Sequence, residues 1–301
     1  MMNSVRDTIF IAYFHILRSI RTRTIIFLFL VYLLISGGMA WFGRTLIHEF
    51  EKQTADTLMV PQTKTPGAMM ETLRTQENFH LLISNMVPNS ELVEWAITLP
   101  VLTIFHYWIS LFVLPFIVAI IGAEMIAPSI KDRSLRYELL RTGRLEVVMG
   151  RFLGQSILIG TGTLLACLAP IFVGQFFMVQ QPLLETIWTL LCFVPKLFVW
   201  SLPFLALGIA LSMITQMTNL ARILALSSVA GSWILYAFLL YHEETGEYSL
   251  LVSLVSPMIP QYHGTALWFP SWDWLLSGSI LITMSIAYCM TGYPLFERRN
   301  I

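Results

Sequence analysis

Long stretches without charge constrain this chain more than any other feature. Six windows of about 20 residues or more contain no Asp, Glu, Lys or Arg, apart from Lys196 in the fourth window. A helix of about 20 apolar residues crosses the ~30 Å hydrocarbon core of a bilayer. We therefore expect an all-α polytopic membrane protein with about six transmembrane helices, within 24–43, 95–123, 152–184, 186–221, 223–242 and 274–296.

Composition favours a membrane protein over a soluble one. Charged residues make up 12% of the chain and hydrophobic residues 56%, whereas a soluble domain carries roughly 25% charge. The formal net charge is zero, which gives no indication of a nucleic-acid partner. The first apolar window begins only at Thr24 and no small-residue cleavage site follows it. We expect this window to be a retained span rather than a cleaved signal.

Basic residues predict the orientation of the chain. If the N-terminus is cytoplasmic, the cytoplasmic segments hold 13 of the 18 Lys and Arg residues, and the outer segments hold 4. Lys and Arg are enriched in cytoplasmic loops of membrane proteins. An even number of spans then places both termini in the cytoplasm.

Four segments of the single domain, 1–301, lie outside a simple span. Residues 1–23 have apolar residues at helical spacing and predict an interfacial helix on the inner leaflet, the alternative being a cytoplasmic extension of the first span. Residues 44–94 form an outer loop, with one short amphipathic helix expected over 69–86. Residues 250–272 contain three prolines, which favours re-entrant or outer short helices over a continuous span.

The fourth segment, 129–143, lies on the cytoplasmic side between the second and third spans. Pro128 breaks the second span, and Ser129 with Asp132 has the spacing of a capping box. We expect about three turns of charged amphipathic helix that close at 142–143. The alternative is an ordinary surface loop.

No catalytic or metal-binding pattern is evident in the sequence. There is no phosphate-binding loop of the GxxxxGK[ST] type and no HExxH motif. His106 stands alone in an apolar window, where a packing role is favoured over a ligand role. The three cysteines and fifteen methionines are also interpreted as packing residues. We therefore expect no catalytic residue and no metal site, which disfavours an intramembrane enzyme.

The cytoplasmic segment and its flanks resemble the permeases of type-2 ATP-binding-cassette (ABC) transporters. The resemblance lies in Gly122-Ala123-Glu124-Met125-Ile126, Asp132-Arg133-Ser134-Leu135-Arg136-Tyr137-Glu138-Leu139-Leu140, Arg144 and Gly150-Arg151-Phe152. The sequence has Ser134 where the family usually has Thr, Thr142-Gly143 where it often has Pro, and Arg151 where it has Lys. The chain is similar in particular to copper-processing and gliding-motility permease subunits, although their substrates do not carry over.

This resemblance implies a membrane-spanning subunit of an ABC exporter, or of a complex that uses such a permease for mechanical signalling, in the bacterial inner membrane. Its partners would be two copies of an ATPase subunit, a second copy of the permease or a related permease, and membrane lipids. ATP and Mg would be bound by the ATPase, so this chain would bind no cofactor and would not itself be an enzyme. The alternative is a secondary transporter or channel-like protein, which a neighbouring gene for a phosphate-loop ATPase would disfavour.

The resemblance also suggests roles for individual residues. Segment 129–143 would be the coupling helix that a cleft in the ATPase receives. Glu124, at the base of the second span, would link that contact to the gate by pairing with a nearby Arg. Lys196 would either reach the outer lipid headgroups or line a dimer cavity and attract an anionic substrate group. The residues expected to contact the ATPase are Lys131, Asp132, Arg133, Leu135, Arg136, Leu139 and Arg141.

Overall fold

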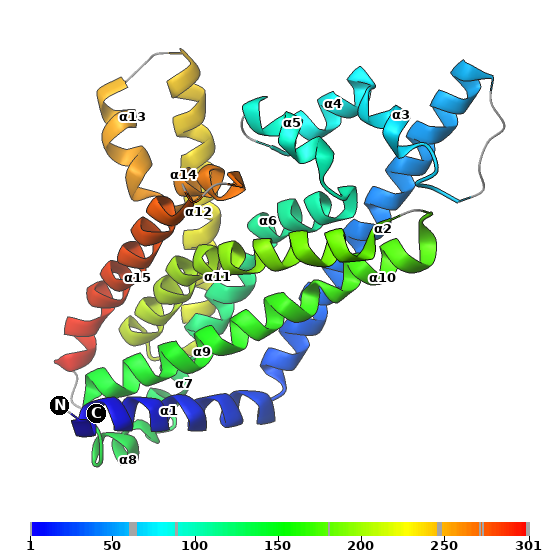
Figure 1. The fold of residues 1–301 in the computed structure, drawn as a ribbon. Helices are drawn as coiled ribbons and strands as arrows, with labels where there is room; N and C mark the ends of the chain where they lie inside the picture. The colour runs from blue at the N-terminus through cyan, green and yellow to red at the C-terminus, as the bar shows by residue number, and fades with distance from the viewer. Residues whose placement is uncertain are drawn as a thin grey trace.

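Figure 1 shows a computed structural model, which describes residues 2–59, 65–87, 90–179, 181–245, 249–270, 272 and 274–298. Every regular element in these ranges is helical. The long helices are α1 (Met2–Arg21), α2 (Thr24–Leu58), α6 (Val101–Ala123), α9 (Arg144–Ala166), α11 (Leu183–Ile214), α12 (Thr218–Thr245) and α15 (Trp274–Glu297). The shorter ones are α3 (Met70–Arg74), α4 (Glu77–Ser84), α5 (Ser90–Thr98), α7 (Ala127–Lys131), α8 (Leu135–Leu139), α10 (Leu168–Phe177), α13 (Ser249–Val255), η1 (Ser256–Met258), α14 (Pro260–Gly264) and η2 (Thr265–Trp268).

Within the residues that the structure describes, six helical segments are long and apolar enough to cross a membrane, which confirms the predicted all-α, polytopic architecture. They are Thr24–Leu58, Val101–Lys131, Arg144–Phe177, Leu183–Ile214, Thr218–His242 and Trp274–Glu297. The chain is therefore a multi-pass membrane protein. The start of α1 and the end of α15 lie at the same end of the bundle (Figure 1), as an even number of spans requires.

The first span extends further than charge alone predicts. The outer loop was expected to begin at Arg44, but α2 continues to Leu58. Two of its charged residues have partners within the protein: Arg44 Nε donates to the carbonyl of Phe177 at 3.2 Å, and the buried Glu51 carboxylate accepts the N–H of Gly67 at 2.9 Å. Because these contacts satisfy the charges, the helix persists beyond the apolar window.

Prolines divide the other windows. Pro100 precedes α6, so the expected second span is split into α5 and α6. The long third window breaks between α9 and α10 at Cys167, three residues before Pro170. Pro182 then precedes α11, as its fixed φ and missing N–H favour at a helix start. The prediction of one helix over 69–86 is wrong, because α3 and α4 are separate helices.

The centre of the bundle is the crossing of α6 and α11. A Cβ added at Gly122 would lie 2.5 Å from the carbonyl oxygen of Leu205 and 3.1 Å from the Cα of Gly208. Only residues without a side chain allow the two backbones to approach this closely, as in membrane helix pairs generally. Nearer the starts of the same two helices, the rings of Tyr107 and Phe193 stack at 4.1 Å. The crossing therefore links the second and fourth spans.

Helix α1 packs along α9 and does not continue into α2. Arg23 has φ 60, so the chain turns sharply between the two helices; this excludes a straight extension of the first span. A Cβ at Gly150 or Gly154 would lie 2.7 Å from Ile11 or Ala12 of α1, so these glycines allow the packing. The other face of α1 exposes apolar side chains: Val5, Ile9, Phe10, Tyr13, Phe14, Leu17 and Ile20.

The segment between α12 and α15 consists of short helices, as its prolines predict. α13, η1, α14 and η2 follow one another, and α14 begins at Pro260. Leu267 and Trp268 of η2 are buried in the core of the bundle. This segment therefore packs onto the ends of the spans.

A candidate coupling site between the second and third spans

The segment between the second and third spans is folded differently from the prediction. A single helix over 130–141 is wrong: two five-residue helices, α7 and α8, are separated by a turn. Arg133 in this turn has φ 56, in the left-handed region that interrupts a helix. Ser129 does not cap a helix; it lies inside α7, where its hydroxyl accepts a hydrogen bond from Arg151 at 3.1 Å.

The start of α7 is anchored to the fourth span. The hydroxyl of Ser212, near the end of α11, accepts hydrogen bonds from the backbone N–H groups of Ile126 and Ala127 at 2.9 and 2.8 Å. The first N–H groups of a helix have no partner within it and require an outside acceptor. Ser212 supplies this acceptor from another span, so the start of α7 is tied to α11.

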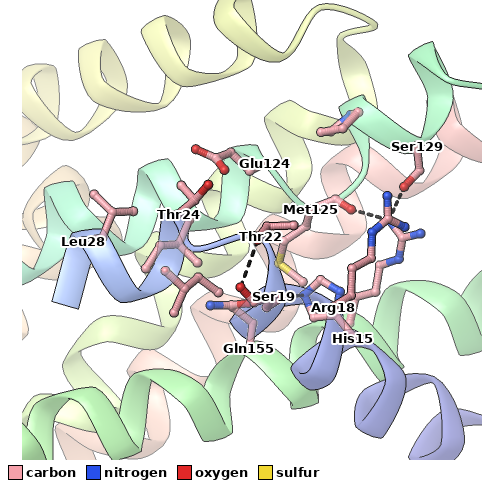
Figure 2. Close-up of a pocket in the computed structure, with 14 residues that line it drawn as sticks. His15, Arg18, Ser19, Thr22, Thr24, Leu28, Glu124, Met125, Ser129 and Gln155 are labelled. Atoms are coloured by element: carbon pink, nitrogen blue, oxygen red, sulfur yellow. Dashed lines mark hydrogen bonds between the residues drawn. The ribbon is translucent and has the colours of Figure 1, made fainter. Parts of the chain in front are cut away.

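Arg151 of α9 holds both halves of the segment. Its Nη2 contacts both carboxylate oxygens of Glu138 in α8, at 2.9 and 2.7 Å, and its Nη1 donates to the carbonyl of Met125 and to Ser129. Figure 2 shows the bonds at Met125 and Ser129. The Arg151 side chain is only 4% exposed. A planar guanidinium can donate hydrogen bonds to all of these acceptors at once, whereas an ammonium, which has one nitrogen, cannot.

Glu124 has the arginine partner that the sequence analysis anticipated. Its Oε1 lies 2.8 Å from Nη2 of Arg222, near the start of α12. The pair is partly exposed and joins the base of the second span to the fifth span. Its link to a gate remains a prediction.

The residues of the segment differ in exposure: some are buried within the chain, and others are open to a partner. Leu135 is fully buried and Leu139 packs against the core, so the prediction that these leucines fill a partner's cleft is contradicted for Leu135. Tyr137 is 75% exposed and Leu140 is 82% exposed. The charged residues of the segment are also exposed: Lys131, Asp132, Arg133, Arg136 and Arg141.

A groove of about 560 Å³ separates α8 from α1. Phe10 and Phe14 of α1 line one side, and Tyr137, Leu140 and Arg141 line the other. The exposed apolar residues of the segment therefore border a groove large enough to receive side chains from another protein.

Lys196 and His106 lie away from this segment. The Lys196 ammonium donates to the carbonyl of Phe269, just after η2, at 2.8 Å, and the lysine is almost fully buried. A backbone acceptor is thus a third partner, besides the headgroup and substrate considered from the sequence. His106 is buried with Nδ1 2.7 Å from the hydroxyl of Ser36, which agrees with a packing role.

Arg151, Glu138 and Ser212 were not assigned as site residues from the sequence. Glu138 and Arg151 did carry a signal, because both belong to the motifs that resemble the permease family, whereas Ser212 carried none. Nothing in the local sequence pairs Arg151 with Glu138, thirteen positions earlier, because the turn at Arg133 sets that geometry.

The fold defines a multi-span membrane protein whose second and third spans are joined by a partly exposed helical segment. A family model described as "ABC-2 family transporter protein" matches residues 10–300, so the chain belongs to the ABC-2 transporter family. Among curated proteins, none shows significant sequence similarity to the chain. The family match confirms the resemblance to type-2 ABC permeases; the narrower similarity to copper-processing and gliding-motility subunits remains a prediction.

Proposed function

We propose that this chain is the membrane subunit of an exporter in the bacterial inner membrane, powered by ATP that separate ATPase subunits hydrolyse. The observation that carries the proposal is the segment α7–α8, which exposes Tyr137 and Leu140 and is hydrogen-bonded to two spans. Its internal contacts run to α11 through Ser212 and to α9 through Arg151. Neighbouring Glu124 reaches α12. ATP and Mg bind to the partner, and two ATPases pair with two permease chains.

Force applied to α8 has a short route into the membrane. A displacement of α8 acts on Arg151 through its contact with Glu138. Arg151 belongs to α9, and α1 packs against the same helix. Ser212 passes motion of α7 to α11, which crosses α6 at a close glycine contact. Packed helices with discrete contacts transmit such displacements as rigid bodies. The contact surface we assign to the ATPase is Tyr137, Leu140 and the exposed charges around them.

Co-purification tests the proposal. The chain is expressed together with a candidate ABC ATPase subunit, and an affinity tag is placed on the chain. We expect the ATPase to remain bound through purification and ATP hydrolysis to appear only in the joint preparation. Recovery of the chain without any ATPase, together with transport that persists when ATP is absent, would instead establish a secondary transporter.

Single cysteines test the proposed orientation. Cys167, Cys192 and Cys289 are replaced by alanine, and either Arg136 or Glu77 is replaced by cysteine; both positions are exposed. An impermeant thiol reagent added to intact cells is expected to label position 77 and not position 136. Position 136 should be labelled only after the cells are opened. Labelling of position 136 from outside would reverse the topology.

A further inference from the structure

A polar cavity of about 150 Å³ lies where α1 meets α2 (Figure 2). Side chains from α1, α2, the end of α6, α7 and α9 surround it. Its polar lining residues are His15, Arg18, Ser19, Thr22, Thr24, Glu124, Ser129, Arg151 and Gln155. Its apolar lining residues include Ile25, Leu28 and Ile121. The cavity therefore offers both hydrogen-bond donors and a hydrocarbon surface.

Two independent features direct unused donors to this cavity. No side chain caps the N-terminus of α2, and Thr24 and Ile25 of its first turn line the cavity. First-turn N–H groups have no acceptor within their helix, and the helix dipole favours an anion there. Gln155 is only 1% exposed, and its Nε2 has no hydrogen-bond partner. A buried amide donor without an acceptor is costly, and a bound anion would satisfy it.

The charges around the cavity leave one arginine available. The carboxylate of Glu124 is paired with Arg222 at 2.8 Å, and Arg151 is held by Glu138. Arg18 has only a long contact of 3.8 Å to Glu138 and is half exposed. Burial, with Arg151 close by, lowers the pKa of His15 to about 4, so His15 is neutral at pH 7. Because Arg18 keeps a positive charge without a close ionic partner, the cavity favours an anionic ligand bound by Arg18.

We propose that this cavity binds the phosphate of an anionic phospholipid from the inner leaflet. The phosphate oxygens accept from Arg18, from Gln155 Nε2 and from the first turn of α2. The apolar residues Leu28 and Ile121 contact the start of an acyl chain. A lipid is favoured over free phosphate because α1 exposes an apolar face beside the cavity. Such a helix lies at the depth of the lipid phosphates.

Native mass spectrometry of the full chain in detergent tests this site. The probe is dioleoyl phosphatidylglycerol, compared with dioleoyl phosphatidylcholine and with inorganic phosphate. We expect one phosphatidylglycerol per chain to bind more tightly than phosphatidylcholine. Arg18→Gln should weaken phosphatidylglycerol binding about tenfold or more, since it removes a charge-assisted hydrogen bond. Gln155→Glu should weaken it as well, because its carboxylate would face the phosphate.

Arg21→Gln is the matched control. Arg21 is exposed on the same helix and does not line the cavity, so its loss should change binding by no more than about twofold. Equal losses in Arg18→Gln and Arg21→Gln, or equal binding of the two lipids, would overturn the site. Binding of inorganic phosphate without any binding of phosphatidylglycerol would overturn the assignment to a lipid. If Gln155→Glu fails to fold, the arginine pair still decides the question.

Discussion

Replacement of Arg151 by methionine is expected to destabilise the protein by about 3 kcal/mol, because it breaks a largely buried ion pair and removes a shared donor. Methionine fills similar space but leaves Glu138, Ser129 and the Met125 carbonyl without their common partner. Thermal unfolding of the purified protein measures the effect. A loss of this size lowers Tm by about 6–12 °C in a large domain.

Two comparisons distinguish this role from the loss of any arginine. Arg136→Met removes an exposed arginine from α8 and should change stability by no more than about 0.5 kcal/mol. Arg151→Lys keeps the charge, but its single nitrogen cannot contact both Glu138 oxygens while also reaching Ser129, so it should give an intermediate loss. A Tm for Arg151→Met equal to that of Arg136→Met would show that the buried pair does not stabilise the segment.

The paired change Tyr137→Glu with Leu140→Glu is expected to weaken ATPase binding about thirtyfold or more. Truncation of a buried interface anchor typically costs about 2 kcal/mol or more, and a charge in an apolar contact adds desolvation. Both side chains are exposed in this chain, so its own fold should tolerate the change. Affinity for the purified ATPase, measured in detergent, gives the result.

Leu184→Glu is the control for this experiment. Leu184 is also 82% exposed, but it lies at the start of α11, at the opposite end of the spans from α8. It should leave ATPase binding unchanged. Unchanged binding in the Tyr137 and Leu140 variant, in a protein that still folds, would show that the ATPase docks elsewhere.

The spans could be predicted from the sequence because the bilayer imposes a simple rule on composition. A run of about 20 residues without charge has few alternatives to a membrane helix. The same rule failed at Arg44 and Glu51, where partners distant in the sequence satisfy the charges and allow α2 to continue. A local pattern records the residue types but not the acceptors that reach them from another segment.

The candidate site was less predictable for a similar reason. The charged residues of the site and their spacing could be identified in the sequence. An arginine partner for Glu124 was also predicted, although not that this partner is Arg222. The capping-box pattern nevertheless gave a wrong helix, because the Ser129 hydroxyl is used by Arg151 instead. Leu135 and Leu139 share a face at helical spacing in either reading, and periodicity alone cannot tell whether that face meets a partner or the protein's own core.

The contact between α1 and α9 also imposes an order on biogenesis. Ala12 is synthesised about 140 residues before Gly154, the glycine against which it packs. A chain emerges from the ribosome N-terminus first, so α1 exists before its docking surface does. Its apolar face can rest on the bilayer surface during this interval, because that face is not the one that α9 later covers. The nascent helix can therefore stay bound to the bilayer surface until the third span has been synthesised.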